Sequence, residues 1–278
     1  MNFTLVTKYI KMNFNNKVVV ITGASSGIGL ALSQEFSAKG AKVVMGARSE
    51  DKLQEIAKEL PNESLFVKTD VTQENECKAL IAKTIERFGK IDVLICNAGL
   101  SMRALYDDVD MSVIHKLMDV NFWGTAYCIK YALPYIQQTK GSIVAVSSVA
   151  GFHGLPARTG YSASKYAIHG LMDTIRVENL KKGIHVMIVA PGFTASNVRF
   201  SALTADGSPQ GETPRKEDKM MTANEVARRI MKGVHKRKRT VLMDFNGRAT
   251  VFIKKFAPRL LDILYYNHMA KEPNSPLK

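Results

Sequence analysis

The sequence predicts an α/β fold of the doubly wound type, with one parallel sheet of about seven strands and helices on both faces. Three observations lead to this prediction. From residue 17 onward, short apolar runs rich in β-branched residues alternate with amphipathic segments of helical period. The first of these runs leads directly into a glycine-rich turn. Polar or glycine-containing motifs follow several later runs, at the strand ends where such sheets bind ligands.

Length and composition fit one folded domain. The chain has 278 residues, of which 46% are hydrophobic and 23% charged, so it can bury a large core. We expect an N-terminal extension over residues 1–16 and a single domain over residues 17–278, because no linker-like stretch divides the chain. No apolar run approaches the ~20 residues of a membrane-spanning helix, and residues 1–16 lack the apolar core of a secretion signal. We therefore expect a cytoplasmic protein.

Cysteine, histidine and charge narrow the range of partners. The three widely spaced cysteines suit a reducing compartment, and the six histidines show no metal-ligand spacing, so we expect no metal. The net charge of +14 favours an anionic partner, which could be a phosphorylated cofactor, an acidic carrier, nucleic acid or a lipid surface. We expect the basic run 236–239 to end a helix. Aromatic side chains do not interleave with it, so we do not expect nucleic-acid binding.

Residues 17–22 form the first expected strand, a β-branched run of the kind that is buried on both sheet faces. The run leads into the glycine-rich turn 23–29 and then into an amphipathic helix that reaches about Lys39. Glycines let the backbone approach a pyrophosphate, and a helix N-terminus attracts an anion, so this unit predicts a dinucleotide site. The expected contacts in the turn are Gly23, Ser25, Ser26, Gly27, Ile28 and Gly29.

The second expected strand, residues 41–46, is followed by Ala47 and Arg48. Sites that bind a ribose 2′-hydroxyl usually carry Asp or Glu at this place. A guanidinium beside uncharged residues suits a 2′-phosphate instead, because it offers a planar, bidentate fork. The sequence therefore predicts NADP(H) in preference to NAD(H). The alternative is that Arg48 is a surface residue that opens the next helix.

Further β/α repeats complete the expected sheet. We expect strands at residues 64–68, 91–95, 141–146, 184–190 and 241–243, and helices at residues 73–88, 112–138, 159–181 and 224–235. The stretch Asn121 to Gly124 is expected to open the helical ladder locally. Cys77 lies on an apolar stripe and is expected in the core. Residues 193–222 lose their periodicity, and we expect them to form a mobile loop that covers the substrate.

Residues 249–278 read as an apolar and basic tail. Pro258 should split its helical pattern near Ala257, because proline does not continue a helix. We expect the tail to dock against the body of the protein or a sister subunit. The alternative is that it lies on an anionic membrane surface.

Tyr161 and Lys165 are spaced so that their side chains share one face of the 159–181 helix. A cation about 4 Å from a phenolate, at an effective dielectric of roughly 20, contributes about 4 kcal/mol, or some three pKa units. We therefore expect Lys165 to lower the pKa of Tyr161 into the range of a working acid/base. The alternative is an ordinary amphipathic helix with Tyr161 partly buried and Lys165 solvated.

Six motifs, in this order and spacing, resemble the short-chain dehydrogenase/reductase (SDR) family in its classical form over about residues 17–198. They are Thr22-Gly23-x3-Gly27-x-Gly29, Asn97-Ala98-Gly99, Asn121, Ser148, Tyr161-x3-Lys165 and Pro191-Gly192. The resemblance implies a Rossmann-type fold and NAD(P)-dependent hydride transfer at a carbonyl or alcohol, as in a carbonyl reductase. One departure is Cys96, which stands where the family usually has an asparagine.

By position, the resemblance implies a role for each matched residue. Tyr161 would be the proton donor or acceptor, Lys165 would lower its pKa and hold the nicotinamide ribose, and Ser148 would hydrogen-bond the substrate oxygen. Asn121 would hold a water in a proton relay through Lys165. The remaining implied cofactor contacts are Arg48 at the 2′-phosphate, Asp70 and Val71 at the adenine, Asn97, Ala98 and Gly99 beside it, and Pro191, Gly192 and Thr194 at the nicotinamide.

The partners implied are a small-molecule carbonyl or alcohol substrate and further copies of the chain. The tail extends beyond the usual end of the family, which favours a homodimer over the common homotetramer. The competing hypothesis is a catalytically silent NADP-binding regulatory or scaffold protein.

Overall fold

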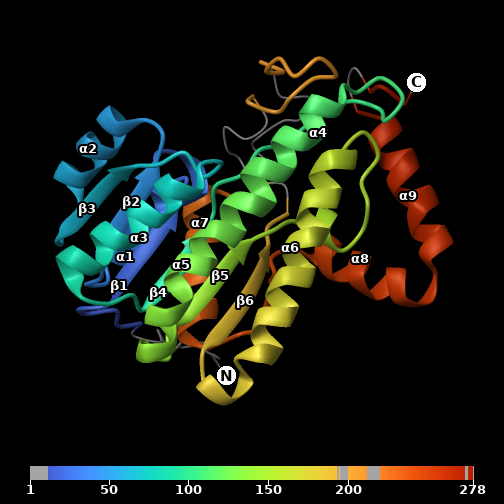
Figure 1. The fold of residues 1–278 in the computed structure, drawn as a ribbon. Helices are drawn as coiled ribbons and strands as arrows, with labels where there is room; N and C mark the ends of the chain where they lie inside the picture. Colours follow the sequence, from blue (N-terminus) through green and yellow to red (C-terminus); the bar gives the residue numbers. More distant parts are fainter. Residues whose placement is uncertain (1–11, 193, 195–199, 212–219, 273–274, 278) are drawn as a thin grey trace, which may run out of the picture.

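A parallel seven-stranded sheet forms the centre of the part that the computed structural model describes, residues 12–192, 194, 200–211, 220–272 and 275–277. Its strand order is β3-β2-β1-β4-β5-β6-β7 (Figure 1). The strands are β1 (Val18–Thr22), β2 (Lys42–Ala47), β3 (Ser64–Lys68), β4 (Val93–Cys96), β5 (Ser142–Val146), β6 (His185–Ala190) and β7 (Thr240–Leu242). The predicted doubly wound fold is confirmed. The strand order reverses between β1 and β4, where sheets of this kind bind their ligand.

Helices cover both faces of the sheet (Figure 1). One face carries α1 (Gly27–Ser37), α2 (Glu50–Glu59) and α7 (Ala223–His235), and the other carries α3 (Glu74–Phe88), α5 (Gly124–Thr139) and α6 (Thr159–Glu178). Successive strand residues point to opposite faces. Val19 and Ile21 of β1 therefore enter one core, and Val18 and Val20 enter the other. Both faces are covered, which explains why the strands read as continuous apolar runs.

The predicted helix 112–138 consists of three consecutive pieces. They are α4 (Met111–Leu117), a π-helical turn (Met118–Trp123) and α5. The local opening expected at Asn121 is thus confirmed. Single π turns in α-helices occur frequently at functional sites. The other predicted elements are present, with ends that differ by a few residues; α6, for example, ends at Glu178 and a 3-10 turn (Leu180–Lys182) follows it.

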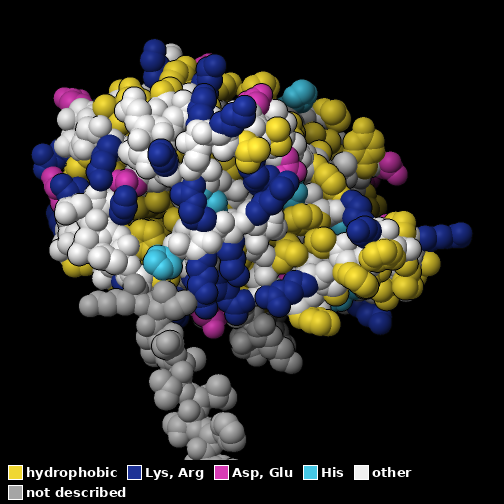
Figure 2. All heavy atoms as spheres, turned by 90° about the horizontal axis from the view of Figure 1, so that it is seen from below, with side chains coloured by type: hydrophobic (Ala, Val, Ile, Leu, Met, Phe, Trp, Pro, Cys, Tyr) yellow, Lys and Arg dark blue, Asp and Glu magenta, His cyan; other side chains and the backbone are white. Residues whose placement is uncertain are grey.

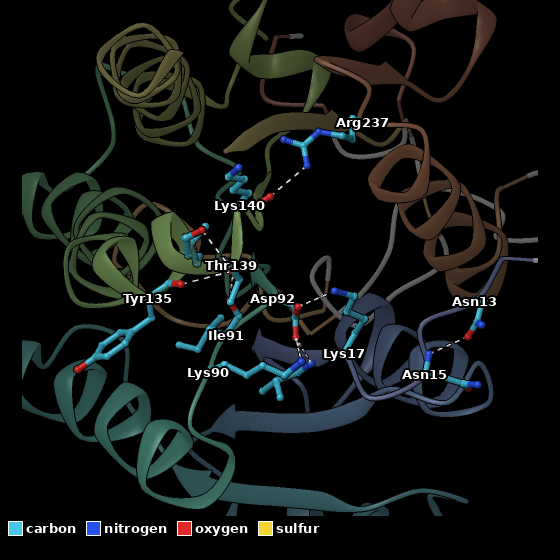
Figure 3. Close-up of polar contacts among 12 residues, drawn as sticks. Asn13, Asn15, Lys17, Lys90, Ile91, Asp92, Tyr135, Thr139, Lys140 and Arg237 are labelled. Atoms are coloured by element: carbon cyan, nitrogen blue, oxygen red, sulfur yellow. Dashed lines mark hydrogen bonds and ion pairs between the residues drawn. The ribbon is translucent and has the colours of Figure 1, made fainter. Parts of the chain in front are cut away.

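Asp92 joins the amino ends of β1 and β4 (Figure 3). Its carboxylate accepts hydrogen bonds from Lys17 Nζ at 2.8 Å and from the Val18 amide at 2.9 Å, and it pairs with Lys90 Nζ at 3.0 Å. Burial acts to raise the pKa of Asp92, but these hydrogen bonds hold it below its usual value. The buried carboxylate therefore fixes the edge of the sheet opposite the strand ends that carry the motifs.

The segment before the first strand belongs partly to the folded body. Phe14, which the sequence placed in the N-terminal extension, is buried, and its ring centroid lies 4.9 Å from that of Phe36 in a T-shaped arrangement. Residues 1–11 of the predicted extension lie outside the described residues.

The basic run 236–239 follows the end of α7 at His235. Arg237 donates to the carbonyl oxygens of Lys140 at 3.1 Å and Gly183 at 2.6 Å. Lys140 is the C-cap of α5 and Gly183 that of the 3-10 turn, so this cation caps neighbouring elements rather than its own helix.

The tail folds into two helices, α8 (Phe245–Phe256) and α9 (Pro258–Ala270). The break falls at Ala257, before Pro258, as predicted. Lys254 Nζ donates to the Phe152 carbonyl oxygen at 2.5 Å, and Arg103 pairs with Glu272 at 3.6 Å, with both partners buried. The tail therefore docks on the body, which confirms the first of the two expectations for it.

Among the described residues, the structure contains no helix with the length and apolar character needed to span a membrane.

Candidate active site

A cavity of about 910 Å³ opens at the carboxyl ends of the strands. Nearly all the residues predicted from the motifs line it. They are Gly23, Ser25, Ser26, Gly27, Ile28, Arg48, Asp70, Val71, Asn97, Ala98, Gly99, Ser148, Tyr161, Lys165, Pro191, Gly192 and Thr194. Gly29 and Asn121 are the two predicted site residues that do not line the cavity, so their contribution must be indirect.

The glycine-rich turn packs directly on the segment that follows β4. Gly23 and Gly27 have positive φ angles of 65° and 52°, which only glycine adopts without strain. A Cβ on Gly23 would lie 2.8 Å from the Ala98 Cα, and a Cβ on Gly29 would lie 2.1 Å from the Gly23 carbonyl oxygen. Gly29 therefore allows α1 to approach the turn closely, while the turn itself faces the cavity.

Hydrogen bonds hold the two loops together. The Thr22 hydroxyl accepts from the backbone amides of Asn97 at 3.0 Å and Ala98 at 3.1 Å. The Asn97 side-chain amide donates to the carbonyl oxygens of Thr22 at 3.0 Å and Gly23 at 3.2 Å. Asn97 thus fixes the shape of the glycine-rich turn. These contacts give a physical reason for the pairing of the two motifs in the sequence.

The far end of the cavity suits the adenosine part of a dinucleotide. Arg48 lies just beyond β2 with its side chain exposed, and the structure gives it no ion-pair partner among the described residues. Asp70 is held in place because its carboxylate accepts hydrogen bonds from the amide and hydroxyl of Thr72, at 3.0 and 2.8 Å. A rigid carboxylate on one strand end and a cation on the next provide two different polar contacts for a nucleotide.

Tyr161 and Lys165 stand one turn apart on α6, and both face the cavity. The Lys165 ammonium lies 5.6 Å from the centroid of the Tyr161 ring and donates to the Val146 carbonyl oxygen at 3.0 Å. Lys165 is almost wholly buried and Tyr161 is half-buried at the cavity wall. The reading of Lys165 as a solvated residue on an ordinary amphipathic helix is therefore wrong.

The pKa of Tyr161 is raised, whereas we expected Lys165 to lower it. Burial raises the pKa of Tyr161, and a hydrogen bond to Ser148 and the charge of Arg158 oppose this only in part. Burial also lowers the pKa of Lys165 to about 8. The prediction of a lowered tyrosine pKa is wrong because burial of the phenol outweighs the opposing effects of Ser148 and Arg158. Tyr161 is consequently a neutral phenol at pH 7 and can donate a proton.

Ser148 begins the 3-10 turn after β5 (Val149–Gly151), where its hydroxyl accepts from the Ala150 amide at 3.2 Å. The same side chain hydrogen-bonds Tyr161. Its neighbour Ser147 is instead 2.8 Å from His169 Nε2. Both serines line the cavity, but Ser148 is the one that acts on the pKa of Tyr161.

Asn121 lies in the π turn, wholly buried behind the cavity wall. Its amide accepts from the Leu100 nitrogen at 2.8 Å, and donates to the Leu100 oxygen at 3.0 Å and the Ser164 hydroxyl at 2.9 Å. A Cβ on Gly99 would lie 3.3 Å from Asn121 Oδ1 and 3.5 Å from Lys165 Nζ. The side chain therefore fixes the 99–101 segment beside Lys165. The water-holding role stays a prediction.

Several cavity residues lie outside the motifs singled out in the sequence. Leu155 and Arg158 precede α6, Leu203 and Pro209 belong to the expected covering loop, and the tail contributes Asp244, Asn246, Gly247 and Tyr265. Leu203 is buried and bonded through its backbone to Ser101 and Arg103, at 2.9 and 2.8 Å. The other parts of the predicted loop, residues 193, 195–199 and 212–219, lie outside the described residues. For the residues that begin α8, a usable signal was Asp244, an N-cap residue type placed before a helical pattern.

The fold and the cavity together define a dinucleotide-binding oxidoreductase, and the residues present fit such a cofactor. The glycine-rich turn admits close approach, the N-terminus of α1 faces the cavity, and a phenol and an ammonium stand at its opposite end.

Comparisons with known proteins agree with this class. Residues 17–206 match the sequence family described as short chain dehydrogenase. The chain is 36% identical to Dehydrogenase/reductase SDR family member 7B of Mus musculus, over 95% of this chain and 85% of that protein. It is 32% identical to 11-beta-hydroxysteroid dehydrogenase A of Sesamum indicum, over 94% of this chain and 78% of that protein.

Solved structures show the same architecture. An alcohol dehydrogenase from Thermococcus sibiricus, complexed with 5-hydroxy-NADP, superposes with a TM-score of 0.69 at 27% identity, over 81% of this chain and 93% of that one. A short chain dehydrogenase/reductase from Burkholderia phymatum, in complex with NAD, shares the fold with a TM-score of 0.79 at 24% identity, over 89% and 96%. The chain belongs to the short-chain dehydrogenase/reductase family, as its motifs predicted.

Proposed function

We propose that this protein is an NADP(H)-dependent oxidoreductase that reduces a carbonyl, or oxidises the corresponding alcohol. One observation carries the proposal: Ser148, Tyr161 and Lys165 line the wall of one cavity, with Ser148 near enough to Tyr161 to act on the pKa of its phenol. Two hydroxyls that converge on one point can hold a carbonyl oxygen between them. NADPH, when bound, supplies the hydride for the carbonyl carbon.

The protein's own groups handle the oxygen and its proton. Ser148 donates a hydrogen bond to the substrate oxygen and stabilises the negative charge that develops there. Tyr161 gives its proton to that oxygen, and the phenol holds this proton at neutral pH because burial raises its pKa. The buried Lys165 ammonium faces the tyrosinate that remains. Asn121 acts as a positioning residue, because its hydrogen bonds hold the segment beside Lys165.

The preference for NADP(H) rests on Arg48. The residues at the end of β2 offer a guanidinium and no carboxylate for the adenosine ribose, which favours a 2′-phosphate. Relatives of this fold include complexes with an NADP analogue and with NAD. The family alone therefore does not decide the choice, and the proposal depends on this side chain.

The cavity favours a bulky apolar substrate. Leu100, Leu155, Leu203 and Tyr265 contribute apolar surface around the polar catalytic wall. Relatives named as hydroxysteroid dehydrogenases support a substrate of this size and character. We further propose that the enzyme works in the cytoplasm as a homodimer.

The experiment is a substrate screen that follows the loss of NADPH absorbance with ketones, aldehydes, 3-oxoacyl thioesters and ketosteroids. We expect turnover with at least one class and a loss of about 10²-fold or more in Tyr161→Phe. Tyr166→Phe is the matched control, since Tyr166 also lies on α6 but does not line the cavity. Equal turnover by Tyr161→Phe and wild type would refute the mechanism. Tight NADPH binding without turnover of any compound would favour the silent scaffold.

A further inference from the structure

The outer face of the two tail helices exposes an unusual amount of apolar surface. The exposed apolar side chains are Phe245, Phe252 and Phe256 on α8 and Leu260, Ile263, Leu264 and Tyr266 on α9. Ile263 and Tyr266 line a cavity against the 153–156 segment of the body, so we call the other five residues the tail face. Each is between 48% and 81% exposed. Their spacing places them along one side of each helix. Scattered exposed apolar residues are ordinary, but a contiguous patch of this kind marks an interaction surface.

The tail is anchored, so the exposed side chains are not those of a loose segment. The opposite side of the helix pair is buried at Thr250, Leu261 and Met269. The Thr250 hydroxyl lies 2.7 Å from that of Tyr265 and joins the two helices, and Lys254 binds the body at Phe152. The body therefore holds one side of the helix pair and leaves the tail face outward.

Basic side chains surround the tail face. Arg248, Lys255, Arg259 and Lys271 are exposed on the two helices and directly after them, whereas Asp262 is the exposed carboxylate in the same stretch. Seen from below in Figure 2, hydrophobic side chains gather at the right, where α8 and α9 lie in Figure 1, with Lys and Arg side chains projecting among them. The Lys255 ammonium lies 5.4 Å from the centroid of the Phe256 ring, so charge and apolar surface are interleaved.

We propose that the tail face docks the protein on an anionic lipid bilayer. Helices with aromatic and aliphatic side chains on one face and flanking Lys and Arg bind at the boundary between headgroups and acyl chains. Each cation near an anionic bilayer surface adds to the binding. The net charge of +14 acts in the same direction over the whole molecule.

A second copy of the chain fits this face less well. A two-fold symmetric contact would place the tail face of one copy against the same face of the other. The four exposed cations of one copy would then lie near the four of the other, and in the described tail each copy offers a single exposed carboxylate to balance them. Like charges in a contact of this kind are unfavourable, whereas an anionic bilayer complements them.

The test measures co-sedimentation of the full chain with vesicles of phosphatidylcholine alone or of phosphatidylcholine with phosphatidylserine. We expect binding to the anionic vesicles, and binding weakened about tenfold or more in Phe252→Ser/Phe256→Ser. Lys255→Glu/Arg259→Glu should also weaken binding about tenfold, and added salt should weaken the wild type. None of the four substituted residues lines the main cavity, so NADPH binding serves as a check of folding.

The matched control is Val177→Ser/Leu180→Ser, which removes two side chains of similar exposure, 72% and 76%, outside the tail. It should bind vesicles as the wild type does. Absence of wild-type binding to anionic vesicles would overturn the proposal, as would equal loss in the control. A dimer that dissociates in Phe252→Ser/Phe256→Ser, without vesicle binding by the wild type, would assign the face to a second copy instead. The readout is independent of turnover, so the proposed function can fail without affecting this result.

Discussion

At the scale of single residues, the site depends on how far each ionisable group is removed from water. Lys165 is buried at the end of β5 with one carbonyl partner, Val146, and burial lowers its pKa from the usual 10.5 to about 8. Tyr161 is also removed from water, but its charged form is the deprotonated one, so burial raises its pKa. A buried ammonium is costly to the folded state, and such costs are typical of functional sites.

This cost can be measured in Lys165→Met. Between about pH 8 and 10.5 the folded wild type binds fewer protons at Lys165 than the unfolded chain, so its stability rises with pH across this window. Below pH 8 the full penalty, about 3 kcal/mol, is present. We therefore expect Lys165→Met to unfold at higher urea than the wild type at pH 7, and to lose this advantage by pH 10.5. The same pH dependence in both proteins would contradict the assignment.

Arg48 gives a second prediction at this scale. Arg48→Asp removes the charge-assisted hydrogen bonds to a 2′-phosphate and places a repulsive carboxylate there, so NADPH affinity should fall about 10- to 100-fold. NADH affinity should be unchanged or improved. Lys52→Asp on α2 makes the same charge change outside the cavity and should leave the preference unaltered. Fluorescence titration measures the affinities for NADPH and NADH. An unchanged preference in Arg48→Asp would refute the 2′-phosphate site.

At the scale of elements, the start of α8 is fitted to the end of β6. Asp244 caps α8 by accepting from the Gly247 amide at 2.7 Å. A Cβ on Gly192, in the motif after β6, would lie 1.8 Å from the Asp244 carboxylate. Gly192, which we predicted to border the nicotinamide, therefore also makes room for the start of α8.

The two residues should consequently be coupled. Asp244→Ala should cost about 1 kcal/mol through the lost cap. Gly192→Ala should cost at least as much, because the new methyl group displaces the capping carboxylate. In Gly192→Ala/Asp244→Ala the clash is absent, so the double variant should be destabilised by less than the sum of the two single effects. Urea unfolding of the four proteins measures this difference, and simple additivity would show that the close contact has no energetic consequence.

At the scale of the whole molecule, the tail completes a cavity begun more than two hundred residues earlier in the chain. Tyr265 of α9 lines the same cavity as the glycine-rich turn, and burial raises its pKa, which a hydrogen bond with Thr250 opposes. A further cavity of about 530 Å³ shares Leu155 and Tyr265 with it and lies between α9 and the 153–156 segment. The tail therefore shapes the substrate side of the site.

The proposed function then predicts that Tyr265→Ala lowers kcat/KM more for large ketones than for small ones. A bulky apolar ketone should lose contact with the ring, and its kcat/KM should fall about 10- to 100-fold. A small ketone held only by the catalytic wall should be affected much less. Tyr266→Ala, which removes an exposed ring one residue away and outside the main cavity, is the control. Equal losses for large and small ketones in Tyr265→Ala would show that the ring does not set substrate size.

The sequence by itself determined the sheet, its order of elements and the motif residues that line the cavity. Both faces of the sheet are covered, so each strand is an uninterrupted apolar run, and each motif follows such a run directly. The local opening at Asn121 and the break before Pro258 were predictable for a similar reason, because each was expected from a local residue type.

Only the tertiary structure decided the protonation of the Tyr161 and Lys165 pair, the contribution of the tail to the cavity and the indirect roles of Gly29 and Asn121. Spacing along a helix tells which side chains share a face, but not how much water they lose. The distance from Gly192 to Asp244, or from Leu155 to Tyr265, depends on how elements far apart in the chain pack together. No local pattern in the sequence encodes those contacts.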